Sequence, residues 1–190
     1  MVFGNLEGPI SARGRNQGSI YSFRADPRAI EGLSYAGFDV LSLANNHIWD
    51  WGADALVDTL SILEDGGIAT VGAGANYEQA NRPAVFEVGV ARVAILAYTN
   101  LLPENMQAGE EFPGLSDFDL DKIKETINTL SNHGYLVVVS LHWGDEYQTI
   151  ANDGQQEIAR GLIDAGAGLI VGHHPHVVQQ LENYGDGWVA

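Results

Sequence analysis

Residues 136–141 (LVVVSL) form an almost unbroken apolar run, and this run constrains the fold more than any other feature of the sequence. Such a run is typical of a strand that is buried on both faces of a sheet. Strands of this kind occur in layered α/β proteins, where helices cover the sheet. The chain has 190 residues, of which 45% are hydrophobic, so we expect one sizeable core and a single domain over residues 1–190.

Extended and helical patterns alternate along the rest of the chain. Apolar residues recur at helical spacing in two segments, and Gly66-Gly67 and Gly134 end those segments. Together these patterns predict a layered α/β fold with mixed sheets. Strands are expected at 1–4, 38–43, 68–71, 84–88, 92–98, 136–141, 169–171 and, as a hairpin, within 177–190; helices are expected to begin at Asp26-Pro27, near Ala53, at Asp117 or Asp119 and near Gln155, and 99–116 is expected to be a long loop.

The composition excludes several classes of protein. Nine Lys and Arg residues against 25 Asp and Glu residues give a net charge of −16, and such a surface repels nucleic acid and anionic membranes. No run of about 18 apolar residues is present, so no membrane span is expected, and no signal peptide opens the chain. Cysteine is absent, so any metal must be held by His, Asp, Glu or Asn.

Polar side chains follow four of the predicted strands. In open α/β sheets, ligands bind outside the carboxyl ends of the strands, which makes these positions candidates for a site. A divalent cation needs donors from several strands, because one short segment cannot surround it. The residues concerned are Asn5 and Glu7 after the first strand, Asn45, Asn46, His47 and Asp50 after the second, His142 and Glu146 after 136–141, and His173, His174 and His176 after 169–171.

Taken singly, each of these motifs has an ordinary structural explanation. A lone strand-end histidine such as His142 is often only hydrogen-bonded, and Asn45-Asn46 is a common turn. His174-Pro175-His176 is a better ligand pair, because residues two apart in an extended segment share a side and proline restricts the backbone between them. Their occurrence at successive strand ends favours one metal site that includes His142, His174 and His176.

At this point the residues resemble a known family. The motifs are similar, in the same order, to those of the bacterial CapA family of poly-γ-glutamate capsule synthesis proteins, which belongs to the calcineurin-like metallophosphatase superfamily. The resemblance covers essentially the whole chain and implies an α/β/β/α sandwich. It rests on Asn5-Leu6-Glu7-Gly8-Pro9, Ala36-Gly37-Phe38-Asp39-Val40, Ala44-Asn45-Asn46-His47 with Asp50, His142-Trp143-Gly144 with Glu146-Tyr147, and Gly172 with His174-Pro175-His176-Val177.

The resemblance also implies roles for these residues. Asn46, His142, His174 and His176 match metal ligands, and Glu7 stands near the place of the bridging aspartate. His47 matches the residue near the leaving group, with Asp50 orienting it, although the superfamily's acidic residue directly follows that histidine and Ile48 stands there in this chain. The remaining candidates, Asn5, Asn45, Glu146 and His173, are expected in the second shell of ligands or against the substrate.

The family pattern normally begins with a Gly-Asp strand and continues beyond the last strand of this sequence, so we expect a piece truncated at both ends. The resemblance implies two divalent ions, Mn, Fe or Zn, in the full-length protein. Glu7, Asn46, His142 and His174 would hold one, and only Glu7 and His176 would hold the other. We therefore expect this piece to hold at most one ion well.

Three functions remain open from the sequence. The first is metal-dependent hydrolysis of a phosphoester, ester or amide in the context of an anionic capsule polymer. The second is a non-catalytic accessory subunit that binds the polymer and other capsule synthesis proteins; four of the seven arginines, Arg13, Arg15, Arg24 and Arg28, lie in the first 28 residues. The third is a fragment that binds nothing. The resemblance suggests a cell-envelope or extracytoplasmic location.

Overall fold

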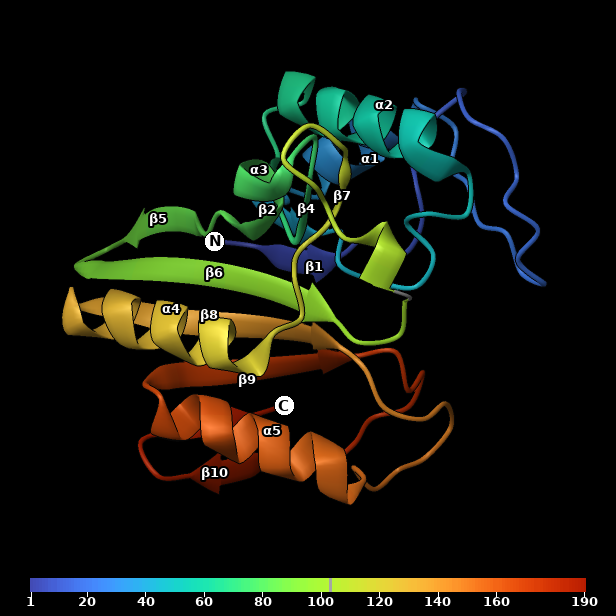
Figure 1. The fold of residues 1–190 in the computed structure, drawn as a ribbon. Helices are drawn as coiled ribbons and strands as arrows, with labels where there is room; N and C mark the ends of the chain where they lie inside the picture. The colour runs from blue at the N-terminus through green and yellow to red at the C-terminus, as the bar shows by residue number, and fades with distance from the viewer. Residues whose placement is uncertain (103) are drawn as a thin grey trace.

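Two β-sheets lie face to face in the computed structural model, which describes residues 1–102 and 104–190 (Figure 1). The smaller sheet has three parallel strands in the order β1-β2-β3, and the larger has six strands in the order β10-β11-β9-β8-β6-β5. A separate antiparallel pair joins β4 (Ala73–Gly74) to β7 (Gly114–Leu115). The strands of the two sheets are β1 (Phe3–Asn5), β2 (Val40–Ser42), β3 (Ala69–Val71), β5 (Ala84–Val88), β6 (Ala91–Thr99), β8 (Tyr135–His142), β9 (Ala167–His173), β10 (Glu182–Tyr184) and β11 (Gly187–Val189).

Helices cover the outer face of each sheet, which produces four layers (Figure 1). α1 (Ala29–Tyr35) and α2 (Gly52–Asp65) lie on the smaller sheet, and α4 (Leu120–Asn132) and α5 (Asp153–Asp164) lie on the larger one. Short helical segments, α3 (Tyr77–Asn81) and η1 (Glu104–Met106), lie in the connections. The predicted α/β/β/α sandwich with mixed sheets is confirmed. No helix in the described part of the chain combines the length and apolar character needed to cross a membrane.

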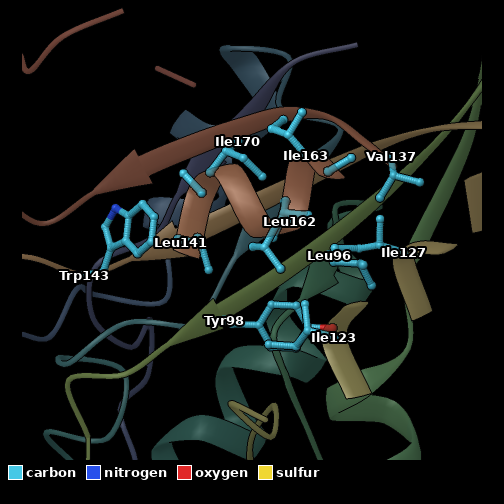
Figure 2. Close-up of a cluster of buried hydrophobic side chains, with 13 residues drawn as sticks. Leu96, Tyr98, Ile123, Ile127, Val137, Leu141, Trp143, Leu162, Ile163 and Ile170 are labelled. Atoms are coloured by element: carbon cyan, nitrogen blue, oxygen red, sulfur yellow. The ribbon is translucent and has the colours of Figure 1, made fainter. Parts of the chain in front are cut away.

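Three hydrophobic clusters hold these layers together. One joins α4 and α5 to the larger sheet and includes Leu96, Ile127 and Leu162 (Figure 2). A second joins α1 and α2 to the smaller sheet, and a third, which includes Val71 and Ile95, lies between the two sheets. The larger sheet is therefore covered on both faces. As predicted for most of the apolar run at 136–141, β8 pairs in parallel with β6 and β9 and its residues 137–142 are buried, whereas Leu136 is exposed.

Local sequence signals predicted most element boundaries well. Asp119 caps α4 by accepting hydrogen bonds from the backbone N–H groups of Asp121 and Lys122. Of the two predicted helix starts, Asp117 and Asp119, the second is therefore the observed one. α5 begins with a capping box in which Asn152 and Gln155 each bond the other's backbone.

Two expectations about the connections were wrong. Asp26-Pro27 does not begin a helix: the Asp26 carboxylate accepts the backbone N–H of Arg28 at 2.9 Å within a turn, and α1 starts only at Ala29. The segment predicted as a loop at 99–116 contains η1 and β7, because β7 finds a pairing partner in β4. Pro103, within that segment, lies outside the described residues.

The two sheets approach closely beside the ends of β2, β3 and β6. Gly72 lies there with φ +87°, and a Cβ atom at this position would lie 2.6 Å from the Cβ of Ala44 and 2.9 Å from that of Ala97. Only glycine fits such a contact without displacing a neighbour. The parallel strands β1 and β2 of one sheet thus end near the parallel strands β8 and β9 of the other, and the polar residues that follow these strands meet.

Candidate metal centre

Glu7, which follows β1, lies between two histidines of the other sheet. Its Oε1 atom is 3.9 Å from Nε2 of His142 and 3.9 Å from Nε2 of His176. The same oxygen is buried and has no hydrogen-bond partner among the described residues. Its other oxygen accepts a hydrogen bond of 3.3 Å from Nδ2 of Asn5. Because a buried, unpaired carboxylate oxygen is costly, this oxygen calls for a positively charged or hydrogen-donating partner between the two imidazoles.

Asn45 links the ends of β1 and β2 and thereby positions the side chain of Asn46. Its fully buried side chain donates from Nδ2 to the carbonyl of Leu6 at 2.8 Å and to Oδ1 of Asn5 at 3.2 Å. Its Oδ1 accepts the backbone N–H of His47 at 3.1 Å. This rigid turn places Oδ1 of Asn46 2.8 Å from Nε2 of His142. Asn5 and Asn45 therefore position the side chains of Glu7 and Asn46.

His47 and Asp50 form a hydrogen-bonded pair. Nδ1 of His47 lies 2.8 Å from Oδ2 of Asp50, whose side chain is 2% exposed. Asp50 also accepts the backbone N–H of Phe23 at 2.8 Å and the hydroxyl of Ser19 at 2.8 Å. Since Nδ1 is engaged, Nε2 is the nitrogen of His47 that remains for a substrate. The predicted orienting role of Asp50 thus has the geometry that it needs.

The histidines after β8 and β9 converge, but not by the route that the sequence suggested. β9 ends at His173, and both His174 and His176 have positive φ, 96° and 57°, so the pair does not share a side through strand alternation. A left-handed loop turns both imidazoles to one place, with ring centroids 5.8 Å apart. The His174 ring also lies 5.1 Å from that of His142. His173 pairs with His142 across β8 and β9 and lies beside the Phe3 ring, but it belongs to neither of the two groups of candidate ligands.

Burial lowers the pKa of three of the clustered imidazoles. It lowers the pKa of His142 to about 3, with a further lowering from His174, His173, His47 and His176. Burial also lowers the pKa of His173 and of His174, and for His174 the nearby carboxylate of Glu146 opposes the shift. Neutral imidazole is the form that binds metal, so protons compete weakly with a cation here at neutral pH.

We expect the metal-free protein to lose stability as the pH falls from about 6.5 to about 3. In that window the unfolded chain protonates His142, whose ordinary value is 6.5, whereas the folded chain does not protonate it until about 3. The lowered pKa therefore leaves folding undisturbed above pH 6.5 and opposes it increasingly below, by about 5 kcal/mol at the acid end. Urea unfolding at a series of pH values measures this decline, which should be shallower in His142→Gln.

The donor set fits a divalent cation. Two groups of side chains bring one ligand atom each within 4.8 Å of the others: Glu7 with His142 and His174, and Glu146 with His174 and His176. Asn46 borders the first group through its contact with His142. Imidazole, carboxylate and amide oxygen together suit Mn, Fe or Zn, and the chain has no cysteine that would favour softer metals.

One neighbour of the site was absent from the sequence prediction. The Phe23 ring lies 4.1 Å from the His47 ring, and its backbone is held by Asp50. No local pattern marks Phe23, because its contact depends on how the segment before α1 folds back on the turn after β2. Glu146 was expected near the site, and its place beside His174 and His176 is more specific than that expectation.

The layered fold and its strand-end ligands define a protein with the fold of the calcineurin-like metallophosphatases. A putative 5'-nucleotidase from Staphylococcus aureus superposes with a TM-score of 0.59 at 20% identity, covering 84% of this chain and 33% of that one. The NAD nucleotidase of Haemophilus influenzae superposes with a TM-score of 0.61 at 16% identity, covering 86% of this chain and 32% of the other. At these identities the likeness concerns the fold.

The chain itself belongs to the family described as "Bacterial capsule synthesis protein PGA_cap", whose sequence model matches residues 1–190. It is 33% identical to the capsule biosynthesis protein CapA of Bacillus anthracis, over 98% of this chain and 47% of that protein. It is 32% identical to the PGA biosynthesis protein CapA of Bacillus subtilis, over 96% of this chain and 49% of that protein. The chain thus spans about half the length of these relatives. The predicted family resemblance is confirmed.

Proposed function

We propose that this chain carries the site of a metal-dependent hydrolase that acts in the biosynthesis of an anionic capsule polymer. The bond broken is a phosphoester or a related ester or amide. The observation that carries the proposal is the Oε1 atom of Glu7, buried and unpaired at 3.9 Å from both His142 and His176. A carboxylate in that position would stabilise a bound cation, whereas its burial without a partner costs free energy.

Glu7, Asn46, His142 and His174 would hold one cation tightly. His176, with Glu7, would hold a second one less well, because fewer buried donors surround it. The chemistry that such cations supply is activation of water and neutralisation of an anionic substrate group. The protein's own contribution is to hold the four ligands on rigid strand ends and to keep the imidazoles deprotonated.

His47 is placed to give a proton to the leaving group from Nε2. Asp50 holds the imidazole in the tautomer with the proton on Nδ1 and stabilises the charged form. The Phe23 ring covers one side of His47 and limits its rotation.

The biological setting of the proposal comes from the relatives. Their names assign them to capsule or PGA biosynthesis, and a Mycobacterium tuberculosis relative, 32% identical over 95% of this chain, is named a probable polyglutamine synthesis accessory protein. We therefore place the chain in the cell envelope, with an anionic polymer as substrate context and other capsule synthesis proteins as partners.

A second candidate function is polymer binding without hydrolysis. The segment that carries Arg13, Arg15 and Arg24 folds back on the turn after β2 through the bond from Arg15 N–H to the Trp51 carbonyl and through Phe23. Arginines on this segment could bind polymer carboxylates beside the cation.

One experiment separates the two functions. The chain is loaded with Mn²⁺, Fe²⁺ or Zn²⁺ and given p-nitrophenyl phosphate, bis-p-nitrophenyl phosphate and poly-γ-glutamate, with chelator-treated protein as control. Metal-dependent release of nitrophenol or shortening of the polymer supports hydrolysis. Saturable binding of poly-γ-glutamate without product, in calorimetry and chromatography, would replace hydrolysis by the accessory function.

A further inference from the structure

Glu146 lies beside the two histidines of the loop after β9, although it follows β8. One of its carboxylate oxygens is within 4.8 Å of ligand nitrogens of both His174 and His176. Its charge is close enough to His174 to oppose the lowering of that residue's pKa. Glu146 is exposed, so its side chain is accessible to solvent, unlike the buried His142.

The backbone around Glu146 is held against the histidine loop. The N–H of Tyr147 donates to the carbonyl of Pro175 at 2.8 Å, which ties the residue after Glu146 to the residue between His174 and His176. The Tyr147 ring also lies 6.1 Å from that of His176. Glu146 therefore does not sit at the free tip of a loop, because a cross-loop bond positions it.

This contact coincides with local backbone strain. In the described part of the chain, Tyr147, His174 and His176 are the three non-glycine residues with positive φ, at 60°, 96° and 57°. Non-glycine residues adopt this conformation at a cost, and it persists where surrounding contacts hold it, commonly at ligand sites. All three lie on the two segments that bring Glu146 to His174 and His176.

The outer position shares a ligand with the inner one. Oε1 of Glu7 is 3.9 Å from Nε2 of His176, the same distance as from Nε2 of His142, so Glu7 can serve a cation on either side. On the outer side, His176 also belongs to the group that Glu146 forms with His174, whose ligand atoms all lie within 4.8 Å of one another. A carboxylate and imidazoles from two different segments are sufficient protein ligands for an ion that keeps some of its water.

We infer that Glu146 is a direct ligand of a second, weaker divalent cation, which it binds beside His174 and His176. This inference rests on the metal centre of the proposed function. It adds Glu146, which is not one of the four residues proposed for the inner cation. The outer cation binds more weakly because Glu146 and His176 are both exposed to water.

A titration of the whole chain with Mn²⁺ tests this inference. Binding is measured by calorimetry and by the electron paramagnetic resonance signal of free Mn²⁺. The wild type should bind two ions in two steps of different affinity. Glu146→Gln keeps the shape of the side chain and removes its charge, and it should weaken the second step about tenfold or more while leaving the first step in place. No activity measurement is needed.

Asp145→Asn is the matched control, because it removes the same charge from the neighbouring residue, whose carboxylate accepts a bond from Asn152 at 2.8 Å. It should leave both steps unchanged. A single binding step in the wild type, or equal weakening by both variants, overturns the assignment of Glu146. Loss of the first step in His142→Ala tests the inner site separately, so a failure of the proposed metal centre is distinguishable from a failure of this inference.

Discussion

Replacing His142 with alanine is expected to abolish tight binding of the divalent cation. Nε2 of His142 lies 2.8 Å from Oδ1 of Asn46 and 3.9 Å from Oε1 of Glu7, so the substitution removes the donor at the centre of the inner group. Losing a supporting partner of a metal ligand commonly costs 10- to 100-fold in affinity, and losing the ligand itself should cost more than about 100-fold. Calorimetric titration with Mn²⁺ or Zn²⁺ measures this loss, and metal-dependent turnover should disappear with it.

The control must separate loss of a ligand from loss of the fold. His133→Ala makes the same replacement at an exposed histidine at the end of α4, and it should bind metal as the wild type does. Asn46→Ala provides a second test of the inner site, since it removes a different ligand without opening a cavity in β8. Retention of tight binding by folded His142→Ala, with a wild-type circular dichroism spectrum, would refute the proposed centre.

Asp50→Asn is expected to lower metal-dependent turnover by about 100-fold or more while leaving cation binding intact. The amide can keep one oxygen for His47 and Phe23 and turn its NH₂ group toward the Ser19 hydroxyl, so the geometry is preserved and the negative charge is lost. Without that charge, His47 keeps its orientation but loses the carboxylate that assists its proton transfer to the leaving group. Turnover and calorimetric cation binding, measured on the same preparation, check this prediction.

Ser19→Ala separates this role from simple support of the loop. It removes one hydrogen bond of 2.8 Å to the same carboxylate without changing its charge, and it should reduce turnover only slightly. Equal effects of Asp50→Asn and Ser19→Ala would show that Asp50 acts by holding the segment around Phe23 rather than through the charge of His47.

Much of the fold could be predicted because its signals are local. The apolar run at 136–141, the cap at Asp119 and the capping box at Asn152 each lie within a few residues of the element that they define. The turn at Asp26 misled the prediction because Asp-Pro is compatible with both a turn and a helix start, and the choice depended on where Ala29 could pack. β4 and β7 were missed because two-residue strands carry no periodicity and exist only through their pairing.

The chemical types of the site residues follow from the sequence, whereas their partners do not. Histidine, asparagine and carboxylate at four strand ends, in a chain without cysteine, already point to a cation held by nitrogen and oxygen. That conclusion needs only the strand pattern, since the carboxyl ends of parallel strands collect ligands.

Only the packing of the two sheets decides which of these residues meet. His142 and Asn46 are 96 positions apart in the sequence, and Phe23 and Asp50 are 27 apart, so no local periodicity relates them. The contact of Glu146 with His174 and His176 depends in turn on a left-handed loop that the His-Pro-His spacing does not reveal. The sequence therefore determined the kind of ligand available at each strand end. The close approach of the two sheets beside Gly72 and the strained loop after β9 determined how those ligands are combined into a site.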